Sequence, residues 1–147
     1  MTTLSGELLW ALHQETILAK LVDPGKDIED LSMVEEGARL VEEDGLGRAL
    51  FAARLLNRVR GASEGECSDF VHGAVAMGDL ASLRSALKEH ETASGRVELG
   101  GGGTLAGTYR HLLEKESWVD ELQERREPLG ALGSWSLYAA VTDGAPS

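Results

Sequence analysis

The sequence predicts a helix-dominated α/β domain, and three observations support this prediction. Apolar residues recur at helical spacing along most of the chain, as they do in helices that bury one face. Arg96–Leu99 is the clearest candidate for a strand, and four consecutive glycines follow it. The 147 residues, 42% of them hydrophobic, suffice for one buried core, so we expect a single domain over residues 1–141 and a frayed tail over 142–147.

The charge and the cysteine content exclude several classes of protein. A net charge of −11 argues against binding to nucleic acid or to an anionic membrane, because phosphate affinity comes from clustered Lys and Arg. The single cysteine, Cys67, excludes an internal disulfide and a paired-cysteine metal site, and the histidines lack zinc-ligand spacing. No apolar run approaches the roughly 18 residues of a membrane span, and no signal segment is evident. We therefore expect a cytoplasmic protein that supplies no metal ligands.

Two helices are predicted in the first third of the chain. Ser5 is a suitable N-cap with Glu7 in the first turn, and apolar spacing continues to Val22 before Asp23-Pro24-Gly25 ends the helix. A second helix is expected to begin near Asp27 and to end at Gly45 as its C-cap.

Two more helices are predicted in the middle of the chain. Leu46–Arg60 is expected to form one helix that ends at Gly61, followed by a linker over residues 62–66. Ser68 or Asp69 would then cap a helix over Phe70–Met77, in which Gly73 and neighbouring alanines allow close packing. Gly78-Asp79 either interrupts this helix or only leaves a gap in its apolar face. The apolar face continues to about His90.

The last third contains the predicted strand. A loop over residues 91–95 precedes it, the glycine run Gly100–Gly103 follows it, and Thr104 is expected to open the next helix. Trp118–Leu122 fits a second short strand or a continuation of the helix. Pro128–Ala140 is expected to form a final helix.

The glycine run is the most informative local feature. Gly100, Gly101, Gly102 and Gly103 lack side chains, so a ligand can approach their backbone N–H groups closely. A following helix would point its positive end at the same place, which suits a nucleotide or a phosphate. The alternative is a flexible connector, and the pattern is neither a Walker A loop nor GxGxxG.

Several segments, taken in chain order, share a pattern with one family. They are Ser5-Gly6-Glu7-Leu8, Leu50-Phe51-Ala52-Ala53-Arg54, Asp69-Phe70-Val71-His72-Gly73-Ala74-Val75, Val97-Glu98-Leu99-Gly100 with Leu105 and Tyr109, and Leu132-Gly133-Ser134-Trp135. In this order and with these gaps they resemble the 2-dehydro-3-deoxygalactonokinases. Glu15-Thr16 and His72 depart from that family's His-Ser and Ser, which fits a distant or degenerating member and leaves the sugar acid open.

The resemblance implies a function and a fold. It implies the C-terminal half of a sugar-acid kinase with an actin-like, ribonuclease H-related fold, which uses ATP and Mg²⁺ to phosphorylate 2-dehydro-3-deoxy-D-galactonate in galactonate breakdown. It places the adenosine beside Gly100–Gly103 and Thr104, and it implies that the catalytic base and the Mg²⁺ ligands come from a missing N-terminal lobe. On this reading the chain alone is inactive, and no catalytic residue is assigned to it.

Three charged residues are candidates for ligand binding, each with a structural alternative. Glu7 could contact the substrate or simply complement the helix dipole. Arg54 could hold an anionic sugar acid or phosphate bidentately, or it could form an ion pair within the protein. Glu15, between Leu12 and Leu18 in the apolar stripe, could be a functional acid, or it could lie at the edge of that stripe or at an interface with the missing lobe.

Two partner predictions complete the analysis. A lone lobe should expose an apolar former interface, so we expect a homo-oligomer or association with the missing lobe. The alternative to the kinase reading is a non-catalytic helical binding or regulatory module derived from the same fold.

Overall fold

The computed structural model describes residues 4–89 and 95–125, and it confirms a helix-dominated α/β architecture. The described elements are α1 (Ser5–Glu15), α2 (Leu31–Asp44), α3 (Leu46–Leu55), the π-helix η1 (Leu56–Arg60), α4 (Glu64–Glu89), β1 (Gly95–Gly100), α5 (Gly103–Leu113) and β2 (Val119–Arg125). The predicted loop over residues 91–95, the final helix Pro128–Ala140 and the tail 142–147 lie wholly or largely outside the described residues. Within the described part, no helix is both long enough and apolar enough to cross a membrane.

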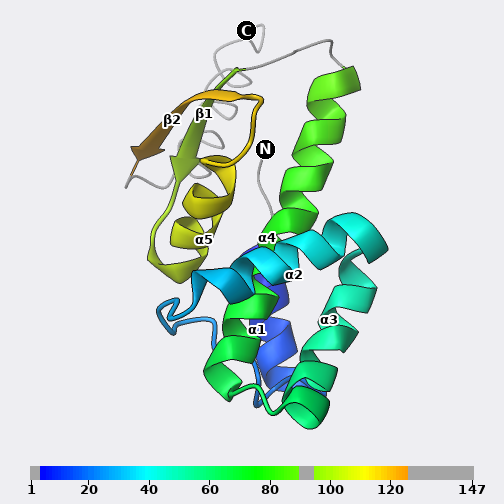
Figure 1. Cartoon of the computed structure of the whole chain (residues 1–147). Coiled ribbons are helices and arrows are strands. Elements are labelled where there is room, and N and C mark those ends of the chain that lie inside the picture. The colour runs from blue at the N-terminus through cyan, green and yellow to red at the C-terminus, as the bar shows by residue number, and fades with distance from the viewer. Residues whose placement is uncertain (1–3, 90–94, 126–147) are drawn as a thin grey trace, which may run out of the picture.

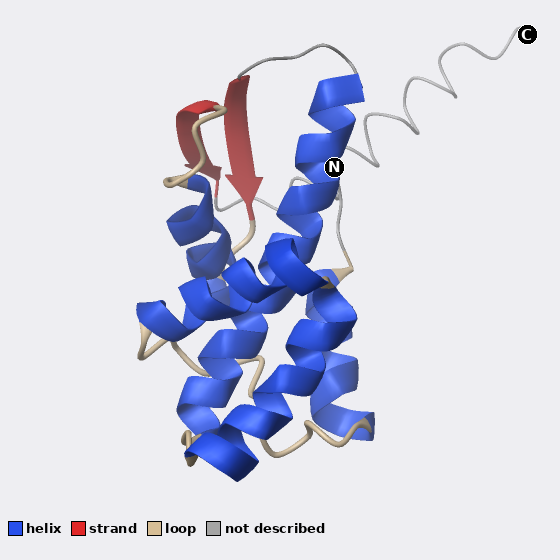
Figure 2. Cartoon of the chain, turned by 45° about the vertical axis from the view of Figure 1, so that its right-hand side comes forward, coloured by secondary structure: helices blue, strands red, loops and turns tan. Residues whose placement is uncertain are grey.

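Helix α4 is the element around which the others are arranged. It runs the length of the molecule in Figure 1, with α2 crossing in front of its middle, α1 behind its lower half and α3 at the lower right. The pair β1 and β2 lies with α5 beside the upper part of α4, and the view in Figure 2 agrees. The largest buried side chains come chiefly from α4, with Leu9, Val34 and Leu113 added from α1, α2 and α5.

Two glycines bring α2 and α4 into backbone contact. A Cβ atom placed on Gly73 would lie 2.0 Å from the Val34 carbonyl oxygen, and one on Gly37 would lie 2.0 Å from the Phe70 carbonyl oxygen. Real Cβ atoms do not approach other atoms so closely, and therefore only glycine fits at this crossing. The predicted close packing at Gly73 is confirmed.

The first helix differs from its prediction at both ends. Ser5 is not the N-cap but the first residue of α1, and Leu4 precedes it without a side-chain cap. The helix ends at Glu15 and not near Val22, because Thr16 leaves the helical conformation. The Thr16 hydroxyl donates to the Leu12 carbonyl at 2.7 Å and accepts the Leu18 N–H at 3.0 Å, which makes this turn.

The start of α2 also shifts. The helix begins at Leu31, four residues beyond the expected start, and Asp30 is its N-cap. The Asp30 carboxylate accepts the Ser32 N–H at 2.8 Å. The expected C-cap is confirmed, since the Gly45 N–H donates to Val41 O and Gly45 has a φ of 84°.

The predicted helix Leu46–Arg60 is present in two parts. It is α-helical through Leu55, and its last turn widens into η1, after which Gly61 ends it with a φ of 71°. None of the residues of η1 is fully buried. Leu56 packs against the edge of the core, and residues 58–60 are exposed.

Helix α4 begins earlier than expected, inside the predicted linker. Ser63 and Glu66 form a capping box: the Ser63 N–H donates to the Glu66 carboxylate at 2.7 Å, and the Glu66 N–H donates to Ser63 Oγ at 3.1 Å. The prediction that Ser68 or Asp69 caps the helix is wrong, because both lie within it and are buried. The helix also continues through Gly78-Asp79 without a break.

The C-terminal part of the described chain is a β–α–β unit. Strand β1 contains the predicted Arg96–Leu99, and β2 settles the alternative at Trp118–Leu122 in favour of a strand. The strands pair in parallel, with Val97 opposite Leu122 and Leu99 opposite Glu124. Parallel neighbours need a crossover, which α5 provides. The turn that leads into α5 carries the glycine run.

Candidate functional site

The four glycines occupy three different kinds of backbone. Gly100 is the last residue of β1, Gly101 and Gly102 form the turn, and Gly103 is the first residue of α5. The prediction that all four form one turn is therefore wrong at both ends. The Gly101 N–H donates to Arg125 O at 3.2 Å, which extends the ladder by one bond. Gly101 has a φ of 115° and Gly103 a φ of 75°, so both positions favour glycine.

The space beside this turn is open. A Cβ atom placed on Gly101, Gly102 or Gly103 would meet no other part of the described protein within 4 Å. Among the described residues, no side chain therefore covers this backbone, and a planar or anionic group can approach it closely.

The start of α5 leaves its first N–H groups without a side-chain cap. The N-cap is Gly102, which has no side chain, and no cap hydrogen bond is formed at this end of the helix within the described residues. The prediction that Thr104 opens α5 is wrong by one residue, since Thr104 is the second helical residue and its carbonyl accepts the Thr108 hydroxyl at 3.0 Å. Uncapped N–H groups and the positive end of the helix dipole favour an anion at this position.

One carboxylate connects α5 to the helical part of the protein. The Asp79 side chain, in the middle of α4, accepts hydrogen bonds from the Tyr109 hydroxyl of α5 and the Ser5 hydroxyl of α1. Tyr109 Oη also lies 3.1 Å from Ser5 Oγ. Sequence reasoning missed Asp79, although it had singled out Ser5 and Tyr109 as parts of a shared pattern. The cluster fixes the helix that follows the glycine turn against α1 and α4.

The sequence profile of one family, 2-keto-3-deoxy-galactonokinase, matches residues 1–132. This match covers most of the chain and includes both the glycine turn and the Ser5–Asp79–Tyr109 cluster. The chain belongs to the 2-keto-3-deoxy-galactonokinase family. Neither the curated proteins nor the solved structures contain a match to it. The resemblance predicted from the ordered segments is thereby confirmed, and membership implies relation to kinases that act on a sugar acid with ATP.

The two residues predicted to contact the sugar acid of this galactonokinase relative lie on different helices. Glu7 is exposed in the first turn of α1 and forms no hydrogen bond or ion pair with the described residues. Arg54 is half-buried in the last turn of α3 and has no ion pair there either, so its predicted structural alternative is not observed. Figure 1 places α3 far from the glycine turn, and the structure therefore does not bring Arg54 and Gly101–Gly103 together.

The structure places Glu15 at the surface and His72 in the core. Glu15 is exposed at the end of α1, which fits the alternative that it lies at the edge of the apolar stripe and not within it. His72 is completely buried, with Nδ1 2.9 Å from Ser68 O, and packs within the core. Its Nε2 has no partner among the described residues.

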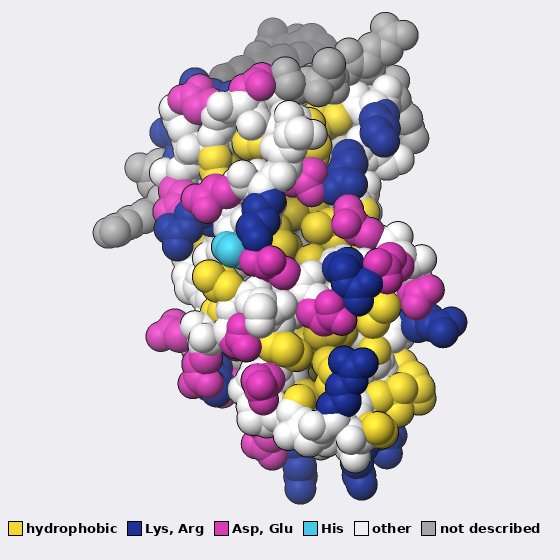
Figure 3. Space-filling model, viewed as in Figure 1, with side chains coloured by type: hydrophobic (Ala, Val, Ile, Leu, Met, Phe, Trp, Pro, Cys, Tyr) yellow, Lys and Arg dark blue, Asp and Glu magenta, His cyan; other side chains and the backbone are white. Residues whose placement is uncertain are grey.

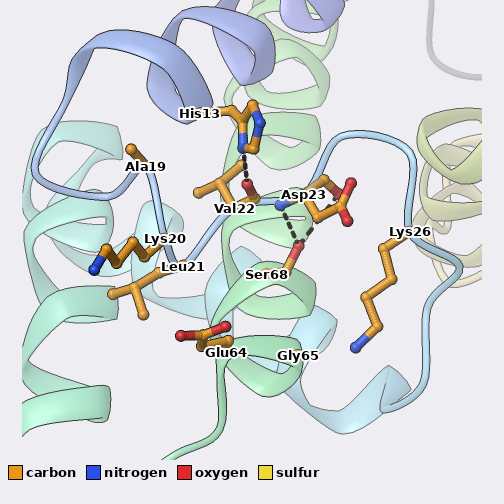
Figure 4. A pocket seen from close by; sticks show the side chains of 10 residues that line it. All are labelled: His13, Ala19, Lys20, Leu21, Val22, Asp23, Lys26, Glu64, Gly65 and Ser68. Atoms are coloured by element: carbon orange, nitrogen blue, oxygen red, sulfur yellow. Dashed lines mark hydrogen bonds between the residues drawn. The ribbon is translucent and has the colours of Figure 1, made fainter.

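A separate pocket of about 410 Å³ lies where the segment after α1 meets the first turns of α4 (Figure 4). His13 Nδ1 lies 2.6 Å from Val22 O on one side, and Ser68 Oγ accepts the Asp23 N–H at 3.1 Å on the other. Lys20 and Lys26 also line it, but Figure 4 shows them on opposite sides of the view, with their amino groups well separated. This pocket contains none of the predicted ligand residues, and its cationic groups do not converge.

Removing the Asp79 carboxylate is expected to loosen α5. Asp79→Ala takes the acceptor from two hydroxyl groups, and hydrogen bonds to a charged group contribute about 1.5–3 kcal/mol each when well ordered. We expect a lower urea midpoint and faster amide hydrogen exchange in α5 than in the wild type. Tyr109→Phe, which keeps the ring and removes one hydroxyl, should show a smaller loss. Identical midpoints and exchange rates in all three proteins would contradict this role.

Proposed function

We propose that the chain is the nucleotide-binding lobe of a sugar-acid kinase of the 2-keto-3-deoxy-galactonokinase type. In this proposal the lobe has an actin-like fold and works with an N-terminal lobe that these residues do not include. The reaction is transfer of the γ-phosphoryl group of ATP to a hydroxyl of 2-dehydro-3-deoxy-D-galactonate. The open backbone of Gly101–Gly103 between β1 and α5 is the observation that supports it most directly.

The residues around this turn suit an adenine nucleotide. The absence of side chains on Gly101 and Gly102 lets the ribose or purine lie against the main chain, where Gly102 is in extended conformation with a φ of −151°. The uncapped start of α5 offers N–H donors and a positive dipole to the phosphates. In this proposal Thr104, in the first turn of α5, adds its hydroxyl to this set.

The ligands of Mg²⁺ and the catalytic base are proposed to lie outside this chain, in the second lobe. Within residues 4–89 and 95–125, no three His, Cys, Asp or Glu side chains gather in a way that could hold a metal ion. Mg²⁺ bound with ATP neutralises charge on the transferring phosphoryl group, and most of the remaining catalysis is positioning and electrostatics. We assign the ligands of that ion and the general base to the other lobe.

Glu7 and Arg54 keep their proposed roles at the sugar acid. Both side chains are free of ion pairs within the described residues, so each is available to a ligand. The Arg54 guanidinium can bind the carboxylate of a sugar acid with two parallel hydrogen bonds, and Glu7 can accept from a sugar hydroxyl. Because they lie apart, each would meet a different part of the substrate or of the second lobe.

Nucleotide binding tests the proposal directly. Isothermal titration of the wild type with ADP or Mg·ATP is expected to give measurable binding, and Gly102→Val is expected to weaken it at least about tenfold, equivalent to roughly 1.4 kcal/mol. The backbone of Gly102 is extended, so valine adds bulk at the turn without strained dihedral angles.

Gly107→Ala is the matched control for this titration. Gly107 lies in α5, and a Cβ there meets nothing within 4 Å, so the affinity should not change. Absence of binding by the wild type would refute the nucleotide site and favour the non-catalytic helical module. Equal affinity of Gly102→Val and wild type would place the nucleotide elsewhere.

A further inference from the structure

Most of the large apolar side chains exposed on the described protein fall into two groups. One group belongs to α1 and the residues that flank it: Trp10 on the helix, Leu4 before it and Ile17 after it are 60%, 74% and 62% exposed. The other lies along α3 and η1 and comprises Phe51, Leu55 and Val59, which are 56%, 46% and 76% exposed. We call these the α1 face and the α3 face. Large apolar side chains that are exposed together on one side of a helix mark an interaction surface, as they do along α3.

The α3 face is a continuous stripe with a positive charge. Phe51, Leu55 and Val59 recur every four residues, so they lie on one side of the helix. The segment Leu46–Arg60 carries four arginines and no acidic residue, although the whole chain has a net charge of −11. Arg58 is exposed and has no ion pair with any described residue. In Figure 3 hydrophobic side chains gather over α3 at the lower right, with Lys or Arg side chains beside them.

Next to Trp10 the charge is negative. Helix α1 contains Glu7 and Glu15 and neither Lys nor Arg, and the nearest lysine in the sequence, Lys20, lies beyond the end of the helix. Glu7 precedes Trp10 by three residues, so its exposed carboxylate lies on the side of the helix that carries the indole. The two faces are therefore complementary in both respects: each offers apolar side chains, and the charges beside them have opposite signs.

We infer that this chain binds a second copy of itself through contact of the α1 face of one copy with the α3 face of the other. Both halves of the contact are present in every molecule, so no other protein is required. A contact between unlike faces is heterologous, and it closes into a ring or extends according to the rotation between copies. Electrostatic complementarity fixes its register, while burial of Trp10 and Val59 contributes most of the affinity. The inference does not rest on nucleotide binding.

Sedimentation velocity over a range of protein concentrations tests the apolar part of the contact. The wild type is expected to self-associate, whereas Val59→Ser and Trp10→Ser are each expected to weaken association about tenfold or more. Both residues are mostly exposed, so the folded monomer should survive, and circular dichroism verifies this. Leu31→Ser is the control, because Leu31 is 47% exposed but belongs to neither face.

A charge exchange tests whether the two faces meet each other. Arg58→Glu alone and Glu7→Lys alone should each weaken association, whereas an equimolar mixture of the two variants should restore complexes that contain both. Lys88→Glu, an exposed change on α4 away from both faces, should have no effect. The assay contains neither ATP nor sugar acid, so its outcome is independent of the proposed kinase role.

Two results would overturn the inference. A wild type that remains monomeric at about 1 mM, where even a weak contact of roughly −4 kcal/mol is half formed, would show that the faces do not bind each other. If the mixture of Arg58→Glu and Glu7→Lys did not restore association, any association would use other surfaces. Both results would leave the faces to a partner other than this chain.

Discussion

Gly73→Ala is expected to destabilise the protein by about 3 kcal/mol or more. The new Cβ would lie 2.0 Å from the Val34 carbonyl oxygen and 2.7 Å from its carbonyl carbon. The obstruction is backbone and not the end of a flexible side chain, so α2 and α4 must separate along their whole contact. Alanine favours a helix over glycine by only about 1 kcal/mol, which cannot offset this clash. Urea unfolding followed by circular dichroism gives the change in free energy.

Gly78→Ala is the matched control on the same helix. A Cβ at Gly78 would lie 3.5 Å from the Leu46 side chain, which is an ordinary contact. The substitution is therefore expected to leave stability unchanged or to raise it by up to about 1 kcal/mol. If Gly73→Ala and Gly78→Ala unfolded at the same urea concentration, the close crossing of α2 and α4 would be disproved.

Asp69→Ala is expected to lower the free energy of unfolding by about 2–4 kcal/mol. The Asp69 side chain is 1% exposed, and one of its oxygens accepts the N–H groups of Glu29 at 3.1 Å and Asp30 at 2.8 Å. Alanine would leave both donors without their acceptor and would leave a void beside the segment that leads into α2. The loss should appear in urea unfolding and in faster hydrogen exchange at the amides of residues 29 and 30.

Asp69→Asn separates hydrogen bonding from packing. Asparagine has nearly the same shape and keeps one acceptor oxygen, so it should retain most of the stability that alanine loses. Protection of the two amides should likewise be retained. Equal losses for the two substitutions would indicate that the negative charge, and not its role as acceptor, holds this segment in place.

The features that could be predicted from the sequence depend on neighbours along the chain. Gly45 and Gly61 end their helices as expected because a positive φ at a helix end is a local property. The predicted start of α4 is wrong because Ser68 and Asp69, two residues that often cap helices, lie closer to the apolar run than Ser63 does. The Ser63–Glu66 spacing was the better signal, since it fits the reciprocal cap that the structure contains.

The features that could not be predicted depend on residues far apart in the sequence. Asp69 reaches back 40 residues to the N–H of Glu29, and Asp79 is 74 residues from Ser5. No spacing rule relates such positions, so a buried aspartate that serves as an acceptor looked like a helix cap. The glycine run was recognised as the informative turn, but its division among strand, turn and helix follows from pairing with β2. The placement of Glu7 and Arg54 on separate helices also required the fold.

The unbroken course of α4 has a mechanical consequence. A continuous helix resists bending, because a sharp kink requires the loss of backbone hydrogen bonds along it. Helices α2 and α3 pack against its N-terminal portion, whereas Asp79, further along the same helix, holds both Ser5 of α1 and Tyr109 of α5. The first helix of the chain and the helix after the glycine turn are therefore anchored to one uninterrupted helix at a single carboxylate, so any displacement of α4 at this point shifts both of them.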